Sequence, residues 1–189
     1  MGPTKIHTRL AEYVVSFKKL LLDYAGISLL KQWKQTEKEN IIPVEDSMLP
    51  EILRIQAEGF KHKNREKISK YSKNFKTIFY VIKSQDKVAG YCIYYLRPVI
   101  SLKGFGKGSV ISEIVIDRDF RGKGFAERLL KESIEEMKLN GTLSILLYVN
   151  ISNQSAIKLY EKIGFRKTKE VQNVCGQNET CYEMELKLV

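Results

Sequence analysis

A strand, a glycine-rich turn, a helix and a second strand follow one another between residues 109 and 149. The composition of residues 109–117 predicts the first strand, and the nearly continuous apolar run at 143–149 is typical of a strand buried in a parallel sheet. The turn between them leads into a segment with apolar residues at helical spacing: Leu129, Leu130, Ile134 and Met137. Two parallel strands joined by a helix cross over right-handed, so this segment predicts an α/β domain built on a central sheet.

The other segments add strands and helices to this unit. Hydrophobic patterning predicts strands at 40–44, 77–82, 88–96, 165–174 and 180–188, and helices at 46–60, 64–72 and 153–162. The stretch at 97–108 contains three glycines and is predicted to be a loop. The order of the elements predicts one central mixed sheet flanked by helices.

The first 38 residues differ from the rest of the chain. Apolar residues recur there at steps of three or four and predict one stripe on a helix: Ile6, Leu10, Tyr13, Val14, Phe17, Leu20, Leu21 and Tyr24. We therefore divide the chain into an N-terminal helical extension, residues 1–38, and a main domain, residues 39–189. The stripe could pack on its own domain, form a dimer contact or rest on a membrane surface, although Lys18-Lys19 is a small basic cluster for the last role.

The chain is strongly basic, with 32 Lys and Arg residues against 22 Asp and Glu residues and a net charge of +10. The stretch from Lys61 to Lys87 contains nine basic residues and two acidic ones, Glu66 and Asp86. This excess favours acidic partners such as phosphates, acidic polypeptides or RNA, and it also favours solubility. No apolar run is long enough for a membrane-spanning helix, so we expect no membrane partner.

The cysteine and histidine content excludes two classes of small domain. Three cysteines, without a CxxC pair and with only two histidines in the chain, argue against a zinc site and against a disulfide framework. The start of the sequence lacks the pattern of a secretory signal, so we expect a cytoplasmic setting. Cys175 and Cys181 flank a predicted turn and could meet across a hairpin, but in the cytoplasm they would be reduced, as would Cys92.

The glycine turn Arg121-Gly122-Lys123-Gly124-Phe125-Ala126 lies where a strand meets a helix. The unpaired N–H groups at a helix N-terminus bind anions, and the two basic side chains would add positive charge, so the turn predicts a pyrophosphate site. An ordinary strand-to-helix turn is the alternative. A dinucleotide-binding fingerprint is excluded because Glu127 occupies the position of its third glycine, and no Walker loop occurs.

Two motifs resemble those of the GCN5-related N-acetyltransferase (GNAT) superfamily. Arg121-x-x-Gly124-x-Ala126 is similar to the acetyl-CoA loop of that superfamily, and the stretch from Asn153 to Phe165 resembles its second signature, N-x-x-A-x-x-x-Y-x-x-x-G-F. The resemblance covers roughly residues 40–189 and is closest to the ribosomal-protein alanine and protein N-alpha-acetyltransferase branch. It implies a GNAT-like fold and acetyl-CoA as cosubstrate.

The resemblance also implies a set of cofactor-binding residues. Backbone groups of one strand would line the pantetheine arm and polarise the thioester: Ile114, Val115 and Ile116. Amides of the turn would hold the pyrophosphate: Arg121, Gly122, Lys123, Gly124, Phe125 and Ala126. Asn153 would reach the arm through its amide, and Tyr160 would return a proton to the departing thiolate. On the residues alone, Asn153 could instead cap a helix and Tyr160 could be a core residue.

The general base is the part of the site that the sequence leaves open. The branch often has a Glu five residues before the signature Asn, and Tyr148 stands there in this chain. Tyrosine is a weak base candidate unless it orders a water. Glu113 is the best remaining carboxylate, but strand alternation or a bulge decides which way it points.

The predicted activity is acetyl transfer from acetyl-CoA to an amine, with a protein N-terminal α-amine as one candidate acceptor. Small-molecule amines are the main alternative within the enzyme class. Another alternative is a non-catalytic CoA-binding module that the basic face recruits to RNA or the ribosome. Phe60 and residues 172–179 are expected to select the acceptor. The sequence is compatible with a monomer or a homodimer.

Overall fold

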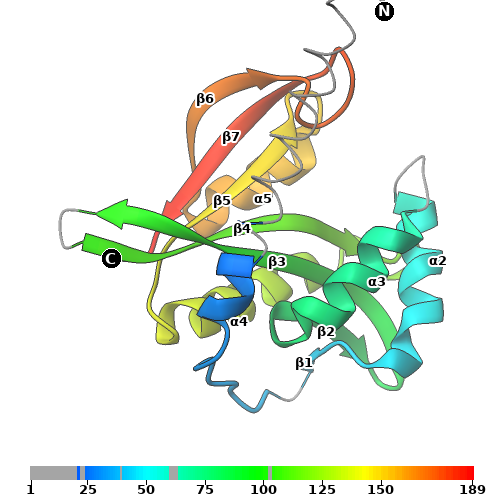
Figure 1. Cartoon of the computed structure of the whole chain (residues 1–189). Helices are drawn as coiled ribbons and strands as arrows, with labels where there is room; N and C mark the ends of the chain where they lie inside the picture. Colours follow the sequence, from blue (N-terminus) through cyan, green and yellow to red (C-terminus); the bar gives the residue numbers. More distant parts are fainter. Residues whose placement is uncertain (1–20, 22–23, 39, 60–63, 102–103) are drawn as a thin grey trace, which may run out of the picture.

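The computed structural model describes residues 21, 24–38, 40–59, 64–101 and 104–189 (Figure 1). Within these residues, seven strands form one sheet in the order β1-β2-β3-β4-β5-β7-β6. The strands are β1 Ile41–Pro43, β2 Phe79–Ser84, β3 Lys87–Ser101, β4 Gly104–Ile116, β5 Thr142–Asn150, β6 Arg166–Gln172 and β7 Thr180–Lys187. β4 and β5 run parallel and the other neighbours pair antiparallel, which confirms the predicted mixed sheet.

Helices cover both faces of the sheet. The helices are α2 Leu49–Gly59, α3 Arg65–Asn74, α4 Phe125–Leu139 and α5 Gln154–Ile163. One buried cluster packs α4 and α5 against the sheet, with Leu130, Tyr94 and Ile157 among its members. A second cluster lies under α2 and α3 on the opposite face and includes Ile55 and Tyr91. We refer to these as the α4 face and the α2 face.

The parallel ladder between β4 and β5 is short. It runs from the pair Lys107–Thr142 to the pair Val110–Leu146 and then ends. Beyond it, β4 continues along β3 and β5 continues along β7 as far as the pair Asn150–Cys181. The two strands therefore part in the middle of the sheet, and Figure 1 shows them diverging.

The prediction of a loop at 97–108 is wrong. β3 and β4 continue through this stretch as a long hairpin, paired up to Ser101 and Gly104. A Cβ atom at Gly106 would lie 2.4 Å from Leu143 Cδ1, and one at Gly108 would lie 2.6 Å from Val99 Cγ1. The glycines are thus needed for close packing of neighbouring side chains over a strand, and do not mark a flexible connection.

Most of the predicted N-terminal stripe lies outside the described residues. Of the first 38 residues, 24–29 are helical, and Leu29, Leu30 and Trp33 pack against the α4-face cluster. The segment that follows is bound to α4 by paired hydrogen bonds: Asn140 accepts from the backbone N–H of Lys34 at 2.7 Å and donates to its carbonyl oxygen at 2.8 Å. This part of the extension therefore packs against the core of the domain. None of the described helices is long and apolar enough to cross a bilayer.

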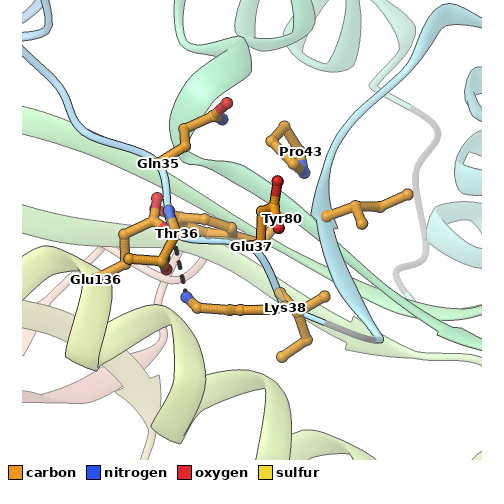
Figure 2. A pocket seen from close by; sticks show the side chains of 9 residues that line it. Gln35, Thr36, Glu37, Lys38, Pro43, Tyr80 and Glu136 are labelled. Carbon is orange, nitrogen blue, oxygen red and sulfur yellow. Dashed lines mark hydrogen bonds and ion pairs between the residues drawn. The ribbon is translucent and has the colours of Figure 1, made fainter.

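The buried carboxylate of Glu136 joins this segment to the sheet (Figure 2). It accepts hydrogen bonds from Trp33 Nε1 at 3.0 Å and Thr36 Oγ1 at 2.9 Å. Tyr80 donates to it at 2.7 Å, and Lys38 forms an ion pair at 3.2 Å. Burial opposes ionisation, but these donors outweigh it and lower the pKa of Glu136 below its usual value.

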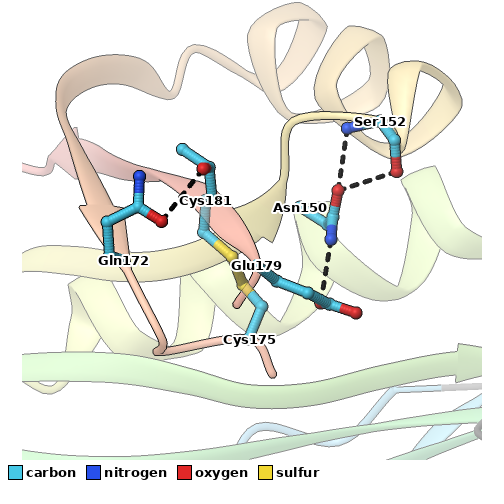
Figure 3. Close-up of a disulfide and its surroundings, with 7 residues drawn as sticks. Asn150, Ser152, Gln172, Cys175, Glu179 and Cys181 are labelled. Atoms are coloured by element: carbon cyan, nitrogen blue, oxygen red, sulfur yellow. Dashed lines mark hydrogen bonds between the residues drawn. A yellow bond between two sulfur atoms is a disulfide. The ribbon is translucent and has the colours of Figure 1, made fainter. Parts of the chain in front are cut away.

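A disulfide joins Cys175 to Cys181, with a Cα–Cα distance of 6.3 Å (Figure 3). The sequence leaves the pairing of these two cysteines open, and the structure joins them. The β6–β7 loop turns back on itself through Asn173 and Asn178, which have positive φ angles of 62° and 61°. The turn brings Cys175 beside the start of β7. Cys92 is free and buried, and burial raises the pKa of its thiol.

The role of Glu136 can be tested by truncation. We expect Glu136→Ala to lower the free energy of unfolding by about 3 kcal/mol, because the Tyr80 hydroxyl, the Trp33 N–H and Lys38 lose their shared partner. The control is Glu135→Ala, one residue earlier on the exposed side of α4, which should change stability by less than about 0.5 kcal/mol. Urea unfolding measures both, and equal effects would contradict this account.

Candidate active site

The glycine turn leaves the N-terminus of α4 open. Asp117 accepts a hydrogen bond from the backbone N–H of Asp119 at 2.8 Å and starts a 3-10 turn at the end of β4. Gly122 and Gly124 then take positive φ angles of 72° and 81°, and the helix begins at Phe125. These angles favour glycine, so both glycines have a structural reason to be there.

The first turn of α4 has the properties of an anion site. Its leading N–H groups have no acceptor within the helix, and Gly124, the residue at the cap position, has no side chain to satisfy them. A Cβ atom at Gly122 or Gly124 would meet nothing within 4 Å among the described residues. A hollow of about 310 Å³ adjoins the turn at Gly124 and is otherwise lined by side chains along α4: Glu127, Arg128, Lys131 and Glu132. The predicted pyrophosphate-binding residues, Arg121 to Ala126, therefore lie together around an open, electropositive helix end.

The two basic side chains of the turn bend back toward the protein. Arg121 Nε donates to the carbonyl oxygen of Ile116 at 3.0 Å, and Lys123 Nζ donates to that of Asp119 at 2.8 Å. Both contacts are solvent-exposed, and Lys123 Nζ also lies 5.7 Å from the centre of the Phe120 ring.

The predicted strand residues Ile114, Val115 and Ile116 lie where β4 has left β5. Their backbone pairs with β3 along one edge, while the edge toward β5 lies beyond the last pair of the parallel ladder. The side chains of Ile114 and Ile116 pack on the α4 face, and that of Val115 packs on the α2 face. The backbone edge of this stretch that faces away from β3 therefore borders the space between the parted strands.

Asn153 and Tyr160 lie on α5, with structural roles of their own. Asn153 caps the helix, because its Oδ1 accepts hydrogen bonds from the Ala156 N–H at 3.2 Å and Ser155 Oγ at 3.1 Å. Tyr160 is buried, with its ring edge-on to Phe165 at a centroid distance of 5.8 Å. Burial raises the pKa of Tyr160, so its hydroxyl keeps its proton at neutral pH. No described residue forms a hydrogen bond with that hydroxyl, which leaves it able to donate to a ligand.

Glu113 lies in a network on the α2 face. Its Oε1 accepts from Lys67 Nζ at 3.0 Å, and its Oε2 accepts from the Tyr91 hydroxyl at 3.0 Å. Gln56 Nε2 lies 3.1 Å from Oε2, and the Glu113 side chain is only 8% exposed. A shift in register next to Glu113, between β3 and β4, sets the direction in which it points. Both carboxylate oxygens are therefore occupied by protein donors.

Tyr148, by contrast, is 37% exposed and lies on β5 just beyond the end of the parallel ladder. Its hydroxyl donates to Glu183 Oε2 at 2.9 Å, and the two residues lie opposite one another on β5 and β7. Burial, followed by the contact with Glu183, raises the pKa of Tyr148 to about 12.

Glu183 is not among the candidates that the sequence supplies. Burial alone would raise the pKa of Glu183, but hydrogen bonds from Thr168, Tyr148 and Lys169 lower it overall. The alternation along β7, in which Tyr182, Met184 and Leu186 pack on the α4 face, indicates that Glu183 points to the other side. Only the strand register reveals that it meets Tyr148.

Comparison with known proteins gives relatives of one kind. The chain is 39% identical over 79 residues to an N-alpha-acetyltransferase of Saccharolobus solfataricus, covering 41% of this chain and 47% of the relative. It is 30% identical over 122 residues to an N-alpha-acetyltransferase of Sulfurisphaera tokodaii, covering 61% of this chain and 72% of the relative. The matched region thus spans less than half of the first of these relatives.

The solved structure of the NatC complex bound to Gag peptide and CoA contains a chain of similar fold. The TM-score is 0.70 at 17% identity, with 80% of this chain and 100% of that chain covered. The model of the family described as "Acetyltransferase (GNAT) family" matches residues 45–165, which is more than half of the chain and includes the parted strands, the glycine turn and α5. The chain therefore belongs to the GNAT acetyltransferase family.

Proposed function

We propose that the protein is an acetyl-CoA-dependent N-acetyltransferase and that its acceptor is the α-amine of a protein N-terminus. The observation that carries the proposal is the combination of two features at one place. The β4–β5 ladder ends at Val110 and Leu146, and the uncapped N-terminus of α4 lies at the end of the same strand β4. Together they offer an extended slot with an anion site at one end, which suits a diphosphate attached to a long arm.

The residues of the slot would hold acetyl-CoA as follows. The N–H groups at the start of α4 would bind the diphosphate, with Arg121 and Lys123 supplying positive charge. The free edge of Ile114, Val115 and Ile116 would pair with the amides of the pantetheine arm. An N–H group of that edge would stabilise the oxyanion that forms when an amine attacks the acetyl carbonyl. Holding both reactants in register supplies much of the acceleration.

Tyr160 is the proposed proton donor to the thiolate that leaves. Its hydroxyl stays protonated because burial raises its pKa. Its position on α5, beside the parted strand β5, supports the role, and α5 begins at Asn153, whose amide nitrogen would reach the arm.

The proposed acceptor is supported by the relatives. Two of them are named N-alpha-acetyltransferases, and the NatC structure contains a peptide together with CoA. The small-molecule amine acetyltransferase and the non-catalytic RNA-recruited module remain the alternative predictions from the sequence.

The acceptor class can be read from a pH profile. A neutral amine is the nucleophile, so kcat/KM rises with pH until the amine is deprotonated. For a peptide α-amine we expect kcat/KM to level off above about pH 8, whereas for a lysine side chain or a polyamine it would rise to about pH 10. Burial raises the pKa of Tyr160, so it stays protonated throughout this range and adds no descending limb to the profile. Free CoA release with acetylated products identified by mass spectrometry is the measurement.

The result also separates the alternatives. Turnover with polyamines and none with any peptide would overturn the proposed acceptor. Absence of turnover with every amine, together with tight RNA binding that weakens steeply with salt, would favour the non-catalytic module.

The role of the glycine turn can be tested with two matched substitutions. Gly124→Ala and Gly141→Ala each place alanine at a positive φ, 81° and 73°, at opposite ends of α4. Each should cost about 1 kcal/mol of stability. We expect only Gly124→Ala to weaken CoA binding, by about tenfold, as measured by calorimetry, because its Cβ points into the proposed diphosphate site. Equal CoA affinity in the two variants would contradict the assignment.

Tyr160→Phe distinguishes a proton donor from a core residue. The variant keeps the ring that packs on Phe165 and removes only the hydroxyl. We expect kcat to fall about 100-fold, the lower end of general acid catalysis, with CoA affinity and melting temperature unchanged. Wild-type kcat would show that Tyr160 serves packing alone.

A further inference from the structure

Tyr148 and Glu183 form a hydrogen-bonded pair on the α2 face, beside the place where β4 and β5 part. We propose that Glu183 takes up the proton that the acceptor amine loses, and that the hydroxyl of Tyr148 passes it on. The inference rests on the proposed acetyl transfer and adds the missing base to it.

The position of Tyr148 follows from strand alternation. Leu146 is the last residue of β5 in the parallel ladder, and Tyr148 is the next residue of β5 on the same face. Leu147 and Val149 are in the buried cluster of the α4 face, so Tyr148 points to the opposite face. It is therefore the first side chain beyond the ladder to border the parted strands from the α2 face, and 37% of it remains exposed to an incoming acceptor.

The carboxylate of Glu183 is oriented so that one of its oxygens accepts a hydrogen bond from Tyr148. Its Oε2 accepts from the Tyr148 hydroxyl at 2.9 Å, and its Oε1 accepts from Thr168 Oγ1 at 2.9 Å. Lys169 Nζ lies 3.4 Å from Oε2, and the side chain of Glu183 is 13% exposed. These donors keep the carboxylate ionised and fix the hydrogen of Tyr148 on it. The lone pairs of the Tyr148 oxygen are thereby left to accept a hydrogen bond from the amine.

Titratable side chains of β6 and β3 lie close to the Tyr148–Glu183 pair. Lys169 on β6 contacts Glu183 directly. On β3, Tyr95 and Arg97 lie close enough to Tyr148 to influence its pKa, the former raising it and the latter lowering it. Both Tyr148 and Glu183 are thus set for their roles: the phenol is protonated and the carboxylate is ionised at neutral pH.

Glu113 is a poorer candidate for the same task. Lys67 and Tyr91 each donate to one of its oxygens, and Gln56 donates as well. A proton transferred to Glu113 would break the ion pair with Lys67 inside a side-chain network that is largely closed to solvent. Glu183 also has a lysine partner, Lys169, but this contact is longer, at 3.4 Å, and its lysine is 60% exposed against 28% for Lys67. The exposed Tyr148 gives an acceptor a route to Glu183 that Glu113 does not have.

The proton and electron balance is complete. The neutral amine nitrogen bonds to the acetyl carbon, and the C–S bond breaks as the tetrahedral intermediate collapses. The ammonium proton on the new amide nitrogen moves to the Tyr148 oxygen while the Tyr148 hydrogen moves to Glu183. The thiolate takes a proton from Tyr160. Exchange with water then returns the proton of Glu183 to solvent and restores that of Tyr160.

Glu183→Gln tests the proposal, with Glu185→Gln as its control two residues along the same face of β7. We expect Glu183→Gln to lower kcat about 100-fold while leaving the KM for acetyl-CoA and the melting temperature unchanged, and Glu185→Gln to behave as wild type. Tyr148→Phe should lower kcat to a similar extent. The double variant should be no slower than either single one, because both act in one relay.

A rescue experiment makes the test specific for a carboxylate. Tyr148→Glu in the Glu183→Gln background puts the carboxylate on the neighbouring strand. The kcat of this double variant should be at least tenfold higher than that of Glu183→Gln alone. No such recovery is expected if Glu183 has a purely structural role. Wild-type kcat in Glu183→Gln or in Tyr148→Phe, or failure of the rescue in a folded double variant, would overturn the inference. If Glu183→Gln does not fold, Tyr148→Phe decides.

The two proposals fail in different ways. A wild-type protein that acetylates no amine refutes the proposed function. A wild-type protein that is active, with Glu183→Gln and Tyr148→Phe equally active, refutes only the relay.

Discussion

The pairing of β5 governs the architecture of this protein. β5 follows β7 along nearly its whole length but follows β4 only as far as Val110 and Leu146. Hydrogen-bonding groups of the β4 backbone are therefore left without a strand partner in the middle of a sheet, where unpaired backbone groups are costly. A ligand with amide groups of its own can satisfy them. The proposed slot for acetyl-CoA follows from this single break in the ladder.

The end of the β4–β5 ladder borders both faces of the sheet, and the proposal places a different part of the reaction on each face. On the α4 face, the open helix end and Tyr160 lie where a thioester carrier would be held and its sulfur protonated. On the α2 face, Tyr148 and Glu183 border the same break where an acceptor would enter. In the proposed reaction the two reactants would approach from opposite faces and meet between the strands, without competing for the same side chains.

Three partly or fully buried glutamates differ in the side chains that donate hydrogen bonds to them. Glu136 accepts from four side chains and joins the N-terminal segment to the sheet. Glu113 is closed in by Lys67, Gln56 and Tyr91. Glu183 has similar partners, but one of them, Tyr148, is exposed beside the break. The carboxylate is the same in all three, and of these three only Glu183 has an exposed tyrosine partner beside the break.

Local signals predicted most of the fold, and they failed where distant segments decide. The glycines at 97–108 are typical of a loop. In the structure they lie in a paired hairpin, where neighbouring side chains pack closely over them. The spacing of Cys175 and Cys181 permitted a disulfide without deciding it, because the backbone path of the β6–β7 loop sets their distance.

The sequence by itself determined the order of the elements, the glycine turn with its positive φ angles, and the caps of α5, because each depends on neighbours within a few residues. The direction of Glu113 and the pairing of Tyr148 with Glu183 were decided only by the tertiary structure. Tyr148 and Glu183 are 35 residues apart and meet only when β5 pairs with β7 in one particular register. A shift of one residue would turn either side chain to the other face of the sheet.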